Sequence, residues 1–239
     1  MTDVSKSPER IAGMFDAIAG KYDLLNHVLS FGIDRRWRRQ AIRSLALTGS
    51  ERVLDLCTGT ADLAIAAVEA RPGAARVVGV DFSAAMLGVG RNKVRQRQFD
   101  RSLTLVRGDA TRLPIAPTSV DAVTIAFGIR NVENTALACA EIGRVLSPGG
   151  RLAILEFAIP TTPVVRDAYL WYFNRVLPGV GRVVSRHHAA YGYLPASVSA
   201  FASPEAFVKI LRQQGFSDVD AKPLTFGIVY LYTGRKTGG

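Results

Sequence analysis

Residues 52–71 read RVLDLCTGTADLAIAAVEAR and are the most informative segment of this chain. The apolar run over 52–59 predicts a buried strand that ends in a turn at Gly59, and 61–71 has the composition of a helix. A strand that leads through a glycine turn into a helix is the repeating unit of α/β proteins. We therefore expect an α/β fold built outward from this unit.

The same alternation continues along the chain. Further strands are predicted at 75–82, 103–110, 120–128, 150–157, 218–225 and 227–236. Helices are predicted at 10–22, 34–47, 83–94, 133–146 and 203–214, with SPGG at 147–150 closing the fourth, and residues 161–200 form a mostly helical insertion. Because the strands are rich in Val, Ile and Leu, we predict a mostly parallel seven-stranded sheet with helices on both faces.

The composition excludes several classes of protein. The chain has 239 residues, 48% hydrophobic and 21% charged, as in a folded globular protein. With two Cys and three His, neither a disulfide framework nor a Cys-rich or multi-His metal site is expected. No apolar run reaches the ~20 residues of a membrane span, and the N-terminus lacks the apolar core of a signal peptide. We expect a cytoplasmic protein.

The charge is strongly basic. Thirty Lys and Arg against twenty acidic residues give a formal net charge of +10. Such an excess is typical of proteins that bind nucleic acid, an anionic membrane or an acidic substrate. It also arises from an Arg-rich composition without any charged partner, so the charge alone leaves these interpretations open.

Acidic and glycine residues gather where the predicted strands end. Asp55–Thr60, Asp81, Asp109 and the segment 127–131 follow the first four strands in order. Because ligands bind at the carboxyl ends of parallel strands, these segments predict one binding site. Taken singly, each acid could instead be a helix cap or a turn residue.

The first loop does not suit a dinucleotide. A pyrophosphate site needs G-x-G-x-x-G, but only Gly59 is present, and the carboxylates of Asp55 and Asp62 would repel a pyrophosphate. They suit S-adenosyl-L-methionine, which carries a sulfonium and an ammonium group. Asp81 ends the second strand, where an acid accepts ribose hydroxyls. Asp109-Ala110 can receive the adenine amino group.

Longer motifs identify a family. The chain resembles the demethylmenaquinone and polyprenyl-benzoquinol C-methyltransferases in YDLLNHVLSFGIDRRW (22–37), FGIRNV (127–132), RVLSPGGRLAILEF (144–157), YGYLPASVSAF (191–201) and GIVYLYTGRK (227–236). The motifs keep the expected order over essentially the whole chain. The resemblance implies a Rossmann-like class I methyltransferase fold. It also implies methyl transfer from S-adenosyl-L-methionine to a ring carbon of a polyprenylated quinol, with demethylmenaquinol as the first candidate.

The resemblance also implies site residues. Cofactor contacts are expected from Asp55, Gly59, Thr60, Asp81, Phe82, Asp109, Ala110 and Ala126. The expected catalytic residues are Arg130, Asn131 and Tyr22. An Arg stays protonated, so Arg130 is expected to stabilise a developing phenolate rather than to act as a base. Alternatively, Arg130 and Asn131 cap the next helix.

The chain departs from the family pattern at four positions. Asp34 stands where a His is usual, Ala126 and Ala158 replace Ser, and Ser147 replaces Lys. Asp34 removes one His as a possible base, and Ala126 leaves only backbone groups to contact the cofactor. The pair His187-His188 is a further candidate base, because His titrates near neutral pH.

Other functions are compatible with the same residues. The substrate could be the 2-polyprenyl-6-methoxy-1,4-benzoquinol of the ubiquinone pathway, another small molecule or an RNA, and a non-catalytic scaffold is a further alternative. Methylation of an RNA base usually needs an Asn/Asp-Pro-Pro-aromatic motif to hold the flipped base. This chain has AFGIRN there, so no nucleic acid partner is expected.

We predict a single methyltransferase domain, divided into a helical cap (1–48), a cofactor-binding core (49–160), an insertion (161–202) and a C-terminal section (203–239). Segment 164–186 carries four Arg and four aromatic residues, and 35–39 reads RRWRR. Arg beside aromatic residues is typical of segments that lie on anionic lipid. A transient contact with the inner face of the cytoplasmic membrane is therefore expected. Alternatively, the aromatic residues form the roof of the substrate pocket and the Arg residues only face water. The oligomeric state cannot be predicted.

Overall fold

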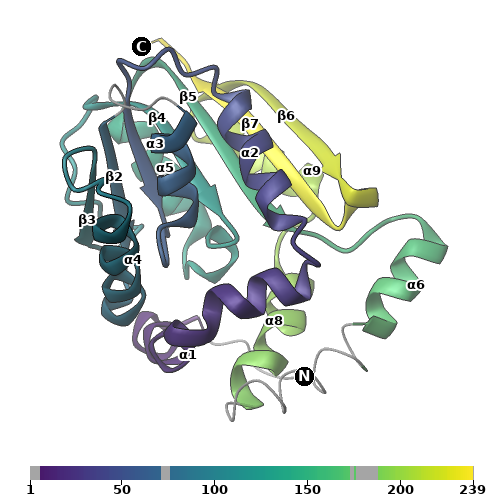
Figure 1. Ribbon diagram of the computed structural model, residues 1–239. Helices are drawn as coiled ribbons and strands as arrows, with labels where there is room; N and C mark the ends of the chain where they lie inside the picture. Colours follow the sequence, from purple (N-terminus) through teal and green to yellow (C-terminus); the bar gives the residue numbers. More distant parts are fainter. Residues whose placement is uncertain (1–5, 71–75, 173–174, 176–187, 239) are drawn as a thin grey trace.

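The computed structural model describes residues 6–70, 76–172, 175 and 188–238. Its centre is a seven-stranded sheet in the order β3-β2-β1-β4-β5-β7-β6 (Figure 1). The strands span Arg52–Leu56 (β1), Arg76–Asp81 (β2), Leu103–Arg107 (β3), Val120–Ala126 (β4), Leu146–Phe157 (β5), Phe216–Leu224 (β6) and Val229–Lys236 (β7). β1 to β5 are parallel, and β7 runs antiparallel to both neighbours, which confirms the predicted sheet.

Helices cover both faces of the sheet. They span Pro8–Leu29 (α1), Asp34–Ser44 (α2), Asp62–Ala70 (α3), Ala84–Gln96 (α4), Thr135–Val145 (α5), Pro163–Trp171 (α6), His188–Ala200 (α8) and Pro204–Gln213 (α9), with 3-10 turns at Ile129–Asn131 (η1) and Thr225–Gly227 (η3). α2 and α3 pack in the core cluster on one face, and α5 and α9 in the cluster on the other.

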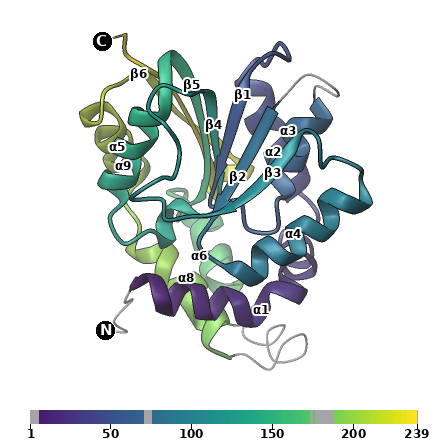
Figure 2. The ribbon, with the colours of Figure 1, turned by 90° about the vertical axis from the view of Figure 1, so that its left-hand side faces the viewer.

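α1, α6 and α8 lie beyond the carboxyl ends of the parallel strands, as Figure 1 and Figure 2 show. They therefore cover the edge of the sheet where ligands of α/β proteins bind. Among the described residues, no helix combines the length and the hydropathy that a membrane crossing requires.

Capping residues explain where two helices begin. Ser83 caps α4, as predicted, because its side chain accepts a 3.1 Å hydrogen bond from Met86 N. Asn134 caps α5 by accepting a 2.9 Å bond from Leu137 N, so this helix starts two residues later than expected. Asn131 lies in η1, and the alternative that it caps α5 is wrong.

SPGG at 147–150 is not the helix stop that its composition predicts. α5 ends at Val145, and the next twelve residues form one strand, β5. The pairing of β5 with β4 shifts register between Val120 and Ala122. Gly149 has a φ of +73°, which glycine adopts without strain. These glycines therefore form a bulge within a strand instead of ending a helix.

Candidate active site

A cavity of about 130 Å³ lies where β1, β2 and β4 end, and we call it the strand-end cavity. Six of the eight residues expected to bind the cofactor line it, namely Gly59, Asp81, Phe82, Asp109, Ala110 and Ala126. β1 has β2 on one side and β4 on the other, so the strand order reverses here. Such switch points are the usual ligand sites of open α/β sheets.

Asp81 is the central acid of the strand-end cavity. Its carboxylate accepts 2.8 Å hydrogen bonds from the backbone N–H groups of Gly59 and Ser83. Burial raises the pKa of Asp81, and the two backbone bonds oppose that rise. The carboxylate is thus fixed on the cavity wall, with lone pairs left to accept bonds from ligand hydroxyls.

Asp55 and Thr60 are not among the residues that line this cavity, so their expected contacts with the cofactor stay predictions. Asp55 is 1% exposed, and its carboxyl oxygens accept bonds from Thr58 Oγ1 (2.5 Å) and Thr124 Oγ1 (2.7 Å). Burial raises its pKa to about 6. Thr60 Oγ1 donates a 2.5 Å bond to Asp23 of α1. Both side chains have protein partners, so they hold the loop in place.

Asp62 is likewise engaged elsewhere. Its carboxylate lies 2.6 Å from Lys93 Nζ and 3.5 Å from an Arg38 nitrogen, and it does not line the cavity. Among the described residues, the acids that do line the strand-end cavity are Asp81, Asp109 and Glu133. The carboxylates predicted at this site are therefore present, but they come from the second and later strands rather than from the first loop.

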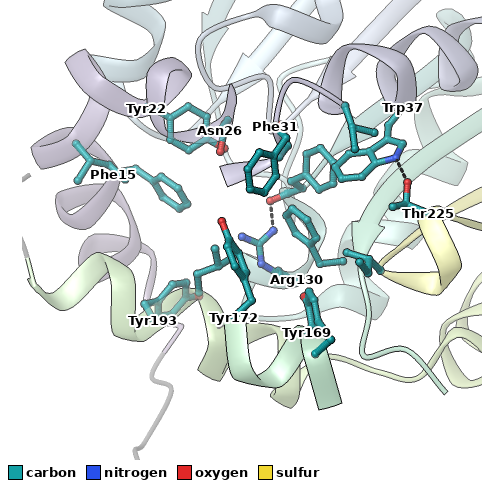
Figure 3. Close-up of a pocket in the computed structure, with 18 of the residues that line it drawn as sticks. Phe15, Tyr22, Asn26, Phe31, Trp37, Arg130, Tyr169, Tyr172, Tyr193 and Thr225 are labelled. Atoms are coloured by element: carbon teal, nitrogen blue, oxygen red, sulfur yellow. Dashed lines mark hydrogen bonds between the residues drawn. The ribbon is translucent and has the colours of Figure 1, made fainter. Parts of the chain in front are cut away.

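A second cavity of about 410 Å³, which we call the aromatic cavity, adjoins the first (Figure 3). Phe15, Tyr22 and Phe127 line both cavities. Phe127 stacks on Phe157 with ring centroids 4.5 Å apart, and Trp37 meets Phe127 edge-on at 5.9 Å. Flat, rigid rings of this kind suit a flat apolar ligand.

Arg130 is the only cationic side chain among the described residues that line the aromatic cavity. Its Nη1 lies 2.9 Å from Glu156 Oε1 and donates to the Phe127 carbonyl, and its Nε donates a 3.3 Å bond to Ser197 Oγ. Glu156 is fully buried and lies outside the cavity lining. The guanidinium is therefore fixed facing the cavity, with its counter-charge behind it.

Asn131 and Tyr193 connect the two cavities. Asn131 lines the strand-end cavity, whereas Tyr193 of α8 lines the aromatic cavity (Figure 3). Tyr193 Oη lies 3.1 Å from Asn131 Oδ1 and donates to it. Burial raises the pKa of Tyr193, so this hydroxyl keeps its proton at neutral pH. Through this bond α8 fixes the orientation of the Asn131 amide.

Sequence reasoning missed Glu156, Ser197 and Tyr193. Glu156 did leave a signal, because a carboxylate inside the apolar run LAILEF must find a buried partner. Ser197 and Tyr193 left none. Their partners in η1 are 67 and 62 positions away in the chain, and nothing local marks such contacts.

Tyr22 lines both cavities. Burial raises the pKa of its phenol, and a hydrogen bond with Asn26 and the charge of Arg130 oppose the rise. Tyr22 is thus a hydrogen-bond donor at neutral pH. Burial also raises the pKa of the Cys57 thiol well above its usual range, so it is not an activated nucleophile. A Cβ at Gly128 would overlap Cys57, which explains the glycine there.

Two other expectations concern positions outside these cavities. Asp34 is 2% exposed and pairs with Arg38 and with His27 (2.9 Å), so it is part of a buried ion pair. The side chains of His187-His188 lie outside the described part of the structure. Within the part that is described, no cluster of three or more His, Cys, Asp or Glu could hold a metal ion.

The basic segment 35–39 is only partly available for a lipid contact. Trp37 and Arg38 are 5% and 7% exposed, which corrects the expectation that the whole segment lies on a membrane. Trp37 faces inward because α2 packs on the sheet, and its Nε1 donates a 2.9 Å bond to Thr225 Oγ1. Arg35, Arg36 and Arg39 are exposed.

The strand-end cavity fits S-adenosyl-L-methionine by its chemistry. Asp81 can accept bonds from ribose hydroxyls, and Asp109 is fixed beside it by bonds from Thr111 N (2.7 Å) and Thr111 Oγ1 (2.8 Å). Phe82 and Ala110 supply apolar wall for a purine ring. One cation, Lys6, also lines this cavity, but the three acids outnumber it and favour a cationic ligand over a phosphate.

Comparisons with known proteins relate this chain to one family over nearly its whole length. The pattern of the ubiE/COQ5 methyltransferase family matches residues 1–236. The ubiquinone/menaquinone biosynthesis C-methyltransferase UbiE of Citrifermentans bemidjiense is 46% identical over 99% of this chain and 100% of that protein. The demethylmenaquinone methyltransferase of Thermus thermophilus is 46% identical over 93% of this chain and 100% of that protein.

A solved structure shows the same fold at low sequence identity. It is phosphoethanolamine N-methyltransferase 2 of Haemonchus contortus in complex with S-adenosyl-L-methionine. The TM-score is 0.64 at 17% identity, and the match covers 85% of this chain and 53% of that one.

Proposed function

The chain belongs to the ubiE/COQ5 methyltransferase family, and we propose that its substrate is demethylmenaquinol, which it converts to menaquinol. It is a C-methyltransferase of quinone biosynthesis that uses S-adenosyl-L-methionine. The name of the Thermus relative supports the naphthoquinol substrate. The double name of the Citrifermentans relative supports a second candidate, the benzoquinol of ubiquinone synthesis.

The observation that carries the proposal is the junction of two chemically different cavities. The strand-end cavity offers acids to a cationic ligand that bears a ribose, and the aromatic cavity suits a flat ring. Three residues, Phe15, Tyr22 and Phe127, belong to both walls. Direct methyl transfer needs two ligands held side by side, and this junction meets that requirement.

The residues divide the chemistry between them. Asp81 and Asp109 would hold the cofactor, whose sulfonium supplies an electrophilic methyl group. A ring carbon is a weak nucleophile, so a phenolic proton must leave to make the ring electron-rich. Arg130 stabilises the phenolate oxygen, and a water molecule beside it takes the proton. Tyr22 donates a hydrogen bond to a quinol oxygen, and Asn131 lies between the two ligands. The methylated carbon then loses its ring proton to solvent and the phenolate oxygen regains a proton, so that the net products are menaquinol, S-adenosyl-L-homocysteine and one proton.

Steady-state kinetics of Arg130→Ala tests the electrostatic role. We expect kcat to fall about 10²–10³-fold. The affinity for S-adenosyl-L-methionine, measured by calorimetry, should change little, because Arg130 does not line the strand-end cavity. Arg130→Lys serves as the matched control. It should recover part of kcat, since Lys keeps the positive charge but lacks the planar guanidinium group with its several N–H donors. Equal losses of cofactor affinity and of turnover would contradict this assignment.

The helical sections contribute most of the aromatic cavity. Residues 1–48 supply α1 and α2, and 161–202 supply α6 and α8, which together line it with η1 and η3. We therefore infer one domain in which these sections form the substrate-binding cap of the cofactor-binding core at 49–160.

We also infer a peripheral position at the inner face of the cytoplasmic membrane. A polyprenyl tail stays in the bilayer, so the enzyme must reach its substrate there. Of the insertion arginines expected to contact lipid, Arg166 and Arg175 are exposed. Arg182 and Arg186 lie outside the described residues.

A further inference from the structure

Exposed apolar side chains gather around the aromatic cavity. Phe31, Phe226, Val164 and Trp171 are 81%, 81%, 80% and 62% exposed, and Ile33 is 38% exposed. They belong to the α1–α2 loop, η3 and α6, which lie on the same side of the molecule (Figure 1). Single exposed apolar residues are common, but a contiguous group marks an interaction site. We call these five residues the apolar rim.

The apolar rim is continuous with the cavity wall. Phe31 and Ile33 line the aromatic cavity themselves, and the Phe31 ring centroid is 6.4 Å from that of Tyr172, another lining residue. Phe226 directly follows the lining residue Thr225. The rim residues therefore stand at the opening through which the cavity meets solvent.

Backbone strain holds one rim residue outward. Thr225 and Phe226 have φ values of +45° and +57°, a region that costs energy for residues other than glycine. Trp37 anchors this turn through its hydrogen bond to Thr225. Phe226 is 81% exposed in this strained turn, so it gains little from burial in the free protein and is available for an external contact.

Cations flank the apolar rim. Arg35, Arg36, Arg166 and Arg175 are exposed and lie within a few positions of Ile33, Val164 or Trp171 in the chain, and Arg166 has an exposed acidic neighbour, Asp167, at 3.1 Å. An anionic bilayer matches this surface, since apolar side chains enter the acyl region while Arg meets the headgroups. A second copy of the chain would bring the same cations and be repelled.

We propose that the apolar rim inserts into a bilayer containing anionic lipid, so that the aromatic cavity opens directly onto the acyl chains. This inference rests on the proposed function, because a polyprenyl tail is the group that would cross that opening. It goes beyond a surface contact by basic residues, because the mouth of the substrate cavity itself forms the docking face.

Trp171 is the natural reporter, since the other Trp, Trp37, is buried. Vesicles of phosphatidylcholine and phosphatidylglycerol with brominated acyl chains should quench Trp171 fluorescence. Val164→Ser combined with Phe226→Asn should weaken vesicle binding at least about tenfold, because less apolar surface is buried. Asn tolerates the positive φ. Leu137→Ser is the matched control, since Leu137 is exposed on α5, away from the rim, and should bind as the wild type does.

A short-tailed, water-soluble quinol without vesicles separates docking from chemistry. Wild type and double variant should methylate it equally, whereas only the wild type should act efficiently on a long-tailed quinol in vesicles. Unquenched Trp171 or equal vesicle binding by both proteins would overturn docking and leave the proposed function intact. Self-association that the double variant abolishes would also overturn it, by showing that a second copy covers the rim. Failure of the wild type on the soluble quinol would contradict the proposed function instead.

Discussion

Glu156 supplies the counter-charge that holds the buried Arg130 guanidinium in place beside the aromatic cavity. It accepts bonds from Arg130 Nη1 (2.9 Å), Arg130 N (3.1 Å) and Phe157 N (2.9 Å), all behind the cavity wall. A buried ion pair adds little net stability, but removing one partner leaves the other charge uncompensated. The pair therefore fixes where the positive charge points.

Glu156→Gln should both lower the stability of the protein and lower its rate of turnover. Leaving Arg130 without its counter-charge should cost about 3 kcal/mol of unfolding free energy. Turnover should fall while the affinity for the cofactor stays within a few-fold, because Glu156 touches neither cavity. Urea unfolding and calorimetry measure both effects. Ser197→Ala, which removes only a 3.3 Å bond to Arg130, is the milder control. Unchanged turnover for Glu156→Gln would refute the positioning role, and an unchanged urea midpoint would refute the predicted loss of stability.

Asp55 should make stability depend on pH. Its folded-state pKa is raised from 3.8 to about 6 by burial. Between these values the folded chain binds more protons than the unfolded chain, so stability falls as pH rises through this window. By neutral pH the loss should be on the order of 2–3 kcal/mol. The stability of Asp55→Asn relative to wild type should therefore improve by this amount between about pH 4 and pH 7. Urea titrations that give a pH-independent difference would contradict it.

At the scale of elements, α1 is the wall shared by both cavities, and acids hold it in place. Asp16 accepts bonds from Ser83 Oγ and from Ala85 N (3.1 Å) at the start of α4. Asp23 lies 2.5 Å from Lys93 Nζ. Ile18 and Ala19 of α1 pack on Met86 of α4. A helix held mainly at one side by acids can lift without unfolding the sheet.

Asp16→Asn should loosen α1. A carboxylate at a helix N-terminus contributes about 0.3–2 kcal/mol, so the cofactor should dissociate several-fold faster, as stopped-flow fluorescence would measure. Hydrogen exchange of the α1 amides should accelerate in the same variant. Glu9→Gln is a matched control, because Glu9 also lies on α1 but is exposed in its first turn. Equal dissociation rates for Asp16→Asn and wild type would show that α1 does not control cofactor release.

Helices and strands whose apolar residues recur at a regular spacing could be predicted from the sequence. Contacts between these elements could not. The seven strands and the acids at their ends follow from apolar runs and turn residues, and Asp81 and Asp109 lie where they were expected. The hydrogen bonds from Thr58 and Thr124 to Asp55 could not be predicted, because nothing in the sequence marks these contacts. The glycines at 147–150 predict the end of a helix but form a bulge within β5, because glycine favours both conformations.

For the whole molecule, the positions of the basic residues are more informative than the net charge of +10. α1, α6 and α8 lie beyond the carboxyl ends of the parallel strands (Figure 1). Residues of these three helices line the aromatic cavity, and α6 carries the exposed Arg166 and Trp171. A molecule of this design can present one end to a membrane while the sheet stays in water.

Charge should therefore govern how tightly that end binds. Arg166→Gln together with Arg175→Gln should weaken binding to anionic vesicles by about fivefold per residue removed. The difference between variant and wild type should shrink as salt is raised, since screening weakens exposed charges. Co-sedimentation with anionic and with neutral vesicles measures this. Binding that is equal for both vesicle types would contradict a role for these cations.

Transfer of a ¹³C-labelled methyl group from S-adenosyl-L-methionine to demethylmenaquinol, followed by carbon NMR of the product, tests the proposed reaction directly. We predict one labelled methyl on a ring carbon, with the chemical shift of an aryl-methyl group, in wild type and almost none in Arg130→Ala. A labelled methoxy signal, or no label in the quinone while other acceptors become labelled, would contradict C-methylation of a quinol in the aromatic cavity.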